Sequence, residues 1–179
     1  MSKNKKIIIA IAFIFIILWI VGIYKLSAMN SSNSNGNSRN IIGIFIEDTL
    51  DITNRYGITN SHPDDQKINK AVVLLNKPLR KVMHASVYLV LALMIIFTIN
   101  MFFKNKKYLK SALITLLLII ALAGFDEYHQ TYVKDRTGDI KDVLIDTIGG
   151  VAGILFYGTY YYVYRRGYNA GIKNNNVLK

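Results

Sequence analysis

Four long apolar stretches dominate the sequence, and polar segments separate them. Each stretch is close to the roughly 20 residues that an α-helix needs to cross a hydrocarbon core of about 30 Å. The predicted spans are residues 7–26, 82–103, 108–125 and 143–164. Because an isolated helix satisfies its own backbone hydrogen bonds in lipid, the pattern predicts an all-α polytopic membrane protein. We expect a single domain over residues 1–179, folded as a four-transmembrane-helix bundle.

The first predicted span resembles a signal peptide, because Lys3, Lys5 and Lys6 precede it. Its apolar stretch is nevertheless longer than a usual signal-peptide core, and Leu26-Ser27-Ala28 matches a small-x-small cleavage site poorly. We therefore expect this span to be a retained membrane anchor.

Between the first and second spans, residues 27–81 predict a long extracytoplasmic loop. Its beginning, residues 27–40, is rich in Ser, Asn and Gly, a composition typical of an exposed loop. Residues 41–50 predict a short amphipathic helix, which either rests on the outer membrane surface or caps the bundle. Pro63 and the acids after it indicate the first turn of another helix, from about residue 64 to residue 76.

Composition and charge agree with a membrane protein. Apolar residues make up 52% of the chain, and the mean hydropathy of +0.28 is high for a soluble globular protein. The absence of cysteine excludes disulfides and thiolate metal ligands. The net charge of +11 would fit nucleic-acid binding, but the placement of the charges gives a different explanation.

Basic residues are concentrated in those segments that face the cytoplasm if the N-terminus lies inside. These inner segments carry no acid, whereas every Asp and Glu falls in the outer segments and balances the basic residues there. The division follows the positive-inside rule. It predicts a membrane protein with both termini cytoplasmic, whose partner is the lipid bilayer and not a nucleic acid.

Ionisable residues also gather beside the apolar runs, where burying a charge costs several kcal/mol unless partners or water are supplied. One such group lies around the end of the third span and the start of the fourth: Asp126, Glu127, His129, Gln130, Arg136, Asp139, Asp142 and Asp146. Asp139 is also a candidate N-cap of the last helix. Asp146 lies about two turns inside that helix, just before a Gly149-x-x-x-Gly153 pattern that lets another helix approach closely.

A second polar stripe precedes the second span. Its members Lys77, Lys81, His84 and Tyr88 recur at i, i+4, i+7 and i+11, which places them on one face of a helix. Lysines at a membrane entrance also snorkel to the headgroups without a further role. We expect this stripe and the acidic group to meet, with His84, Glu127, Arg136 and Asp146 converging on one site.

These two polar blocks resemble the VanZ-like family of small bacterial membrane proteins, named for a teicoplanin-resistance protein. The likeness rests on Arg80, Lys81, His84 and Tyr88, and on the run from Asp126 to Arg136 with the aspartates and glycines that follow. Val87 stands where family members often carry an acid. The resemblance implies a link to glycopeptide or lipoglycopeptide sensitivity and to the cell envelope, without an established reaction.

Two classes of function fit these residues. In the first, the protein is an enzyme or ligand-binding protein acting on an anionic envelope lipid or lipid-linked precursor. Its catalytic candidates are His84, Glu127 and Asp146. Its ligand-binding candidates are Lys81, Tyr88, Gln130, Arg136, Asp139 and Asp142, with Lys81 and Arg136 holding the headgroup.

In the second class, the same groups form a structural ion-pair network in a non-enzymatic accessory protein. A transporter is less favoured, because no broken-helix pattern outlines a path through the membrane. A divalent cation held by His84, Glu127 and Asp146 is a further hypothesis, although HExxH and EF-hand spacings are missing. The sequence identifies neither a substrate nor a cofactor.

Overall fold

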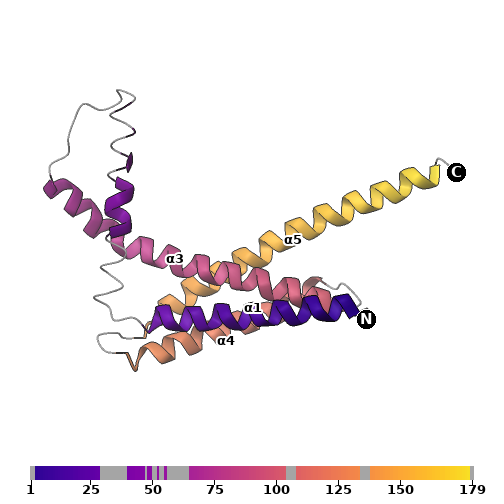
Figure 1. The fold of residues 1–179 in the computed structure, drawn as a ribbon, viewed down its shortest axis with the longest axis horizontal. Helices are drawn as coiled ribbons and strands as arrows, with labels where there is room; N and C mark the ends of the chain where they lie inside the picture. The colour runs from indigo at the N-terminus through magenta and orange to yellow at the C-terminus, as the bar shows by residue number, and fades with distance from the viewer. Residues whose placement is uncertain are drawn as a thin grey trace.

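Helices form all the regular structure that is described. The structure is a computed structural model and describes residues 3–28, 40–46, 48–49, 52, 55, 65–103, 108–133 and 138–177. Figure 1 shows the long helices: α1 (Lys3–Ser27), α3 (Asp65–Phe102), α4 (Tyr108–Gln130) and α5 (Ile140–Val177). Each contains a stretch long and apolar enough to cross a membrane. The prediction of an all-α protein with four spans is confirmed.

The helices extend beyond several of the predicted spans. The short helix expected near residues 64–76 and the span expected from residue 82 are one continuous helix, α3, so part of the predicted loop is helical. Pro78 lies inside α3 and removes one backbone donor without ending the helix. Helix α4 continues five residues past the predicted end at residue 125, to Gln130. Asp126 and Glu127 therefore lie in its last turns.

The apolar core lies where α3 meets the other three helices. Its buried members are Ile16, Ile23, Tyr88, Leu91, Ala92, Ile95, Ile96, Ile119, Ala123 and Ile154. On α1 the buried residues Ile9, Ile16 and Ile23 recur every seventh position, which is one face of a helix. The indole N–H of Trp19 donates to the carbonyl of Val87 at 3.1 Å and so joins α1 to α3.

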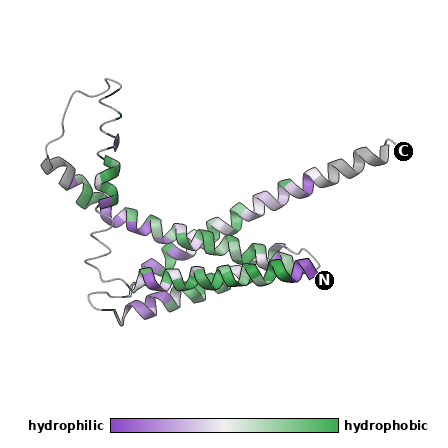
Figure 2. Cartoon of the chain, in the orientation of Figure 1, coloured by the Kyte–Doolittle hydropathy of each residue, from purple (hydrophilic) through white to green (hydrophobic). Residues whose placement is uncertain are grey.

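Apolar side chains also cover much of the outside of the bundle. Phe13, Phe15, Leu117 and Leu155 are examples of large apolar residues that are more than half exposed. In Figure 2 polar residues gather at the end of the bundle where α1 and α4 end and α5 begins, while the middle is apolar. An apolar belt between polar ends is the surface that a bilayer requires.

Part of the segment after α1 is helical, as predicted. Residues 40–46 form a helix in which Ile42 is buried. Ile42 and Phe45 line an apolar groove together with Leu75, Leu79 and Val82 of α3. The helix thus lies against the first half of α3. Residues 29–39 of the predicted loop lie outside the described residues.

The most extensive contact in the bundle joins α3 and α5, and two glycines permit it. A Cβ atom added to Gly149 would overlap the carbonyl oxygen of Ala85. One added to Gly153 would lie 2.5 Å from the carbonyl oxygen of Leu89. The Gly149-x-x-x-Gly153 pattern therefore does what the sequence indicated, and lets the backbones of two helices approach.

Replacing Gly149 with alanine should push α3 and α5 apart, because the new methyl group meets backbone and not a flexible side chain. We expect Gly149→Ala to destabilise the protein by about 1–3 kcal/mol or more, the usual cost of overpacking. The measurement is the thermal unfolding midpoint of purified protein in detergent.

Gly22→Ala is the matched control, because nothing lies within 4 Å of the Cβ position at Gly22. It should leave the midpoint unchanged or raise it, since alanine favours helix over glycine by about 1 kcal/mol. Equal midpoints for the two variants would contradict a tight contact between α3 and α5.

Candidate functional site

A polar cavity lies at the end of the bundle where α1 and α4 end and α5 begins. Its volume is about 20 Å³, enough for one water molecule or one ion. The lining residues come from three helices: Arg80, Lys81 and His84 of α3, Glu127 and Gln130 of α4, and Asp142, Ile145 and Asp146 of α5. The predicted convergence of His84, Glu127 and Asp146 is therefore observed. Arg136, the fourth residue expected there, lies outside the described residues.

Glu127 uses both of its carboxylate oxygens within the protein. Oε1 accepts a hydrogen bond of 2.7 Å from Nε2 of Gln130, and Oε2 accepts one of 2.9 Å from the backbone N–H of Asp139. Asp139 in turn accepts a hydrogen bond from the backbone N–H of Lys141 at 2.9 Å. This is the geometry of a helix N-cap, the role for which Asp139 was a candidate. Glu127 and Asp139 thus hold the start of α5 against the end of α4.

Asp126 is fully buried and faces the inside of the bundle. Its Oδ2 accepts hydrogen bonds from Oγ of Ser27 at 3.0 Å and from Nε2 of Gln130 at 3.2 Å. Its Oδ1 has no hydrogen-bond partner among the described residues. Asp126 belongs to the ionisable group recognised in the sequence, but it was not among the predicted catalytic or ligand-binding residues. Its spacing of four from Gln130, which makes them neighbours on one face, was the signal that could have identified it.

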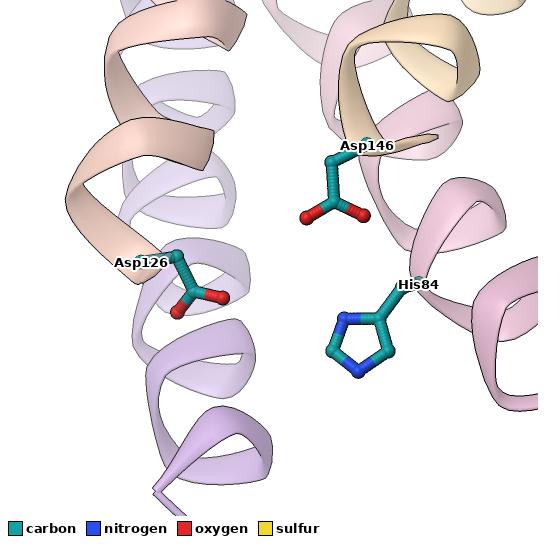
Figure 3. A group of neighbouring side chains, drawn as sticks. All are labelled: His84, Asp126 and Asp146. Carbon is teal, nitrogen blue, oxygen red and sulfur yellow. The ribbon is translucent and has the colours of Figure 1, made fainter. Parts of the chain in front are cut away.

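Asp146 is also buried, with 1% of its surface exposed. Neither of its carboxylate oxygens has a hydrogen-bond partner in the described part of the chain. Its neighbours are His84 and Asp126, and one ligand atom from each of the three residues lies within 4.8 Å of the others. Figure 3 shows the imidazole ring and the two carboxylates facing a common space. The cluster contains Asp126 and not Glu127, the third ligand in the cation hypothesis drawn from the sequence.

At the surface of the cavity an ion pair joins α3 to α5. Nζ of Lys81 lies 3.0 Å from Oδ1 of Asp142, and the two side chains are 43% and 36% exposed. Such partly exposed pairs contribute about 0–1 kcal/mol to stability. Tyr88 lies about one turn beyond His84 and is buried in the apolar core. Lys77, the first member of the stripe, is exposed and is not among the cavity residues.

His129 takes a different environment from the cavity residues. Its ring packs against that of Tyr24 on α1, with ring centroids 5.1 Å apart. It is therefore part of the contact between α1 and α4. Of the two histidines in these polar blocks, His84 is the one that lines the cavity.

Comparison with known proteins gives one result that covers most of the chain. The model of the VanZ/LLP1 family matches residues 10–161, a range that contains both polar blocks and all the cavity residues. Neither a curated protein nor a solved structure gave a match.

The hydrogen bond from Ser27 to Asp126 should stabilise the protein, because it supplies a donor to a buried carboxylate. We expect Ser27→Ala to lower stability by about 0.5–3 kcal/mol, the range for losing one hydrogen bond to a carboxyl group, while Gln130 still donates to the same oxygen. The measurement is again the unfolding midpoint in detergent.

Ser86→Ala serves as the comparison for this substitution. Ser86 is exposed, and its Oγ donates only to the carbonyl of Val82 in its own helix at 2.8 Å. Its removal should change stability by no more than about 0.5 kcal/mol. A Ser27→Ala protein as stable as the Ser86→Ala protein would show that the bond to Asp126 adds nothing.

Proposed function

Because the chain belongs to the VanZ/LLP1 family of membrane proteins, we propose that it acts at the bacterial cell envelope by binding an anionic headgroup. The ligand would be an envelope lipid or a lipid-linked precursor, and binding would contribute to resistance to glycopeptide and lipoglycopeptide antibiotics such as teicoplanin. The observation that carries the proposal is the pair of cations, Arg80 and Lys81, at one polar cavity.

The size of the cavity determines how such a ligand would bind. A volume of about 20 Å³ does not admit a phosphate or a sugar. The headgroup would therefore lie over the mouth, with its anionic oxygens against Arg80 and Lys81. Arginine offers a planar fork of donors that matches phosphate or carboxylate, and lysine adds a compact charge.

Proton transfer to a bound group would involve His84 and Asp146. Both oxygens of Glu127 already accept hydrogen bonds, whereas those of Asp146 accept none from the described residues. A group that serves as a general base needs a lone pair directed at the proton it takes. Asp146 is therefore better placed than Glu127 for this role, with His84 beside it.

This function requires the cavity to open at the outer face of the membrane. The sequence supports that orientation through its cytoplasmic excess of Lys and Arg. The absence of native cysteine permits a direct test, since any reaction with a thiol reagent reports an introduced residue.

A cysteine replacing Thr131, just after α4, should react with a membrane-impermeant thiol reagent in intact cells. One replacing Asn4, at the start of α1, should react only after the cells are permeabilised. Both positions are exposed, so accessibility to solvent does not distinguish them. Labelling of the residue-4 variant alone in intact cells would reverse the orientation.

A structural role is the second candidate, and two contacts favour it. Lys81 pairs with Asp142, and Glu127 holds the backbone of Asp139, so these groups link α3, α4 and α5. In that case the charged residues would maintain the bundle without touching a ligand. The two functions differ in how they respond when either partner of the exposed pair is removed.

Lys81→Gln and Asp142→Asn separate headgroup binding from a structural pair. Both break the same ion pair, and both should fold, because an exposed pair adds only about 0–1 kcal/mol. If Lys81 binds an anion, losing its charged hydrogen bond costs about 1.5–3 kcal/mol, or roughly 10- to 100-fold in affinity. Lys81→Gln should then lower teicoplanin resistance, whereas Asp142→Asn removes a competing carboxylate and should raise it. The measurement is the teicoplanin susceptibility of cells expressing each variant at matched protein levels.

The direction in which resistance changes in the two variants distinguishes headgroup binding from a structural pair. Equal losses of resistance in both variants would support the structural pair and contradict headgroup binding. Full resistance in Lys81→Gln would remove this lysine from the proposed site. Cells carrying an empty vector set the baseline against which resistance is measured.

A further inference from the structure

We propose that His84, Asp126 and Asp146 bind one divalent transition-metal cation, Zn²⁺ or Mn²⁺, at the junction of α3, α4 and α5. The three ligand atoms come from three different helices and lie within 4.8 Å of one another. This site goes beyond the proposed headgroup binding, because a cation would bind there whether or not a headgroup binds at the mouth. With the cation bound, His84 and Asp146 are its ligands and do not transfer a proton themselves.

The geometry fits an ion of this size. Nitrogen and oxygen ligands lie about 2.0–2.2 Å from Zn²⁺, so ligands of one ion are about 3–4 Å apart. The three atoms are already within 4.8 Å and face a common space, as Figure 3 shows. The three atoms are therefore close to the separation that ligands of one ion require.

The buried carboxylate oxygens provide an independent argument. Asp126 and Asp146 are almost completely buried, and together they leave three oxygens without a hydrogen-bond partner in the described part of the chain. Two carboxylates buried side by side repel each other, and burial has removed the water that would stabilise their charges. The ammonium of Lys81 is engaged by Asp142 at the surface. A divalent cation would supply the missing partner and balance both charges.

The donor set limits the kind of cation. One imidazole and two carboxylates suit Zn²⁺ or Mn²⁺, whereas Ca²⁺ and Mg²⁺ are normally held by oxygen ligands alone. Three protein ligands leave a position open for water, and His84 and Asp146 also line the 20 Å³ cavity, which has room for it. Glu127 is not among the three clustered ligands, and its two oxygens accept hydrogen bonds from Gln130 and from the backbone of Asp139.

The test uses the full-length protein purified in detergent with a tag that contains no histidine. The protein is stripped with a chelator and then dialysed against ZnCl₂ or MnCl₂, and bound metal is measured by elemental analysis. We expect one ion per chain and a higher unfolding midpoint after loading, because an ion that binds only the folded state stabilises it. Asp126→Asn, Asp146→Asn and His84→Gln should each lose the bound metal and the metal-dependent rise.

Asp48→Asn is the control, because Asp48 is an exposed acid outside the cluster. It should bind metal as the wild type does. Gel filtration identifies any variant that has not folded, and the response of the wild-type midpoint to metal decides the question if a cluster variant fails.

Two results would overturn the site. The first is equal metal binding by the wild type and all three cluster variants, which would mean adventitious binding elsewhere. The second is a wild type that binds no metal and shows no rise in midpoint. In that case a proton shared by Asp126 and Asp146 replaces the cation, and Asp146→Asn should be at least as stable as the wild type. Neither result bears on headgroup binding, which is judged by teicoplanin susceptibility.

Discussion

The close approach of α3 and α5 at two glycines determines the arrangement of the polar site. Gly149 lies against Ala85, and Gly153 lies against Leu89, four residues further along each helix. The two helices therefore run in the same direction and cross here in a fixed register, as Figure 1 shows. One turn nearer the polar end, the same register places Asp146 beside His84, and two turns nearer along α5 it brings Asp142 to Lys81. Larger residues at these glycines would separate the helices, and both contacts depend on that separation.

The acids of the site divide into two groups with different environments. In the first group each acid has a defined partner. Glu127 accepts from Gln130 and from a backbone N–H, Asp139 caps the start of α5, and Asp142 pairs with Lys81. Asp126 and Asp146 lie deeper and keep oxygens without a hydrogen bond among the described residues. Acids of the first group hold the helix ends together. In the second group, burying carboxylate oxygens without a hydrogen bond is unfavourable, and a ligand, an ion or a proton would remove that cost.

Hydropathy alone predicted the number of spans, because crossing a bilayer requires long apolar helices. It did not predict where the helices end, since polar residues such as those around Asp126 continue a helix after the apolar run stops. Likewise, Pro78 and the polar residues before residue 82 lie within α3 and do not interrupt it.

The sequence placed His84, Glu127 and Asp146 at one end of the bundle, but it did not distinguish Asp126 from Glu127 as the third member of the buried cluster. Adjacent residues on a helix differ by about 100° in direction. Which of the two faces its neighbours depends on the rotation of α4 about its axis, and that rotation is set by packing. The contact of Asp126 with Ser27 at the end of α1 is an example, because it joins residues 99 positions apart in the chain.

The order of the helices along the chain also bears on biosynthesis. Of these helices α5 is synthesised after α3 and α4, so His84 on α3 and Asp126 on α4 are inserted before it. Until it docks, Asp146 has neither neighbour. A lone carboxylate about two turns inside a membrane helix is unfavourable, by up to about 2.5–3.5 kcal/mol, which is the cost at the bilayer centre on insertion scales. An undocked α5 is thus an unfavourable state. The polar cluster thereby couples completion of the site to completion of assembly.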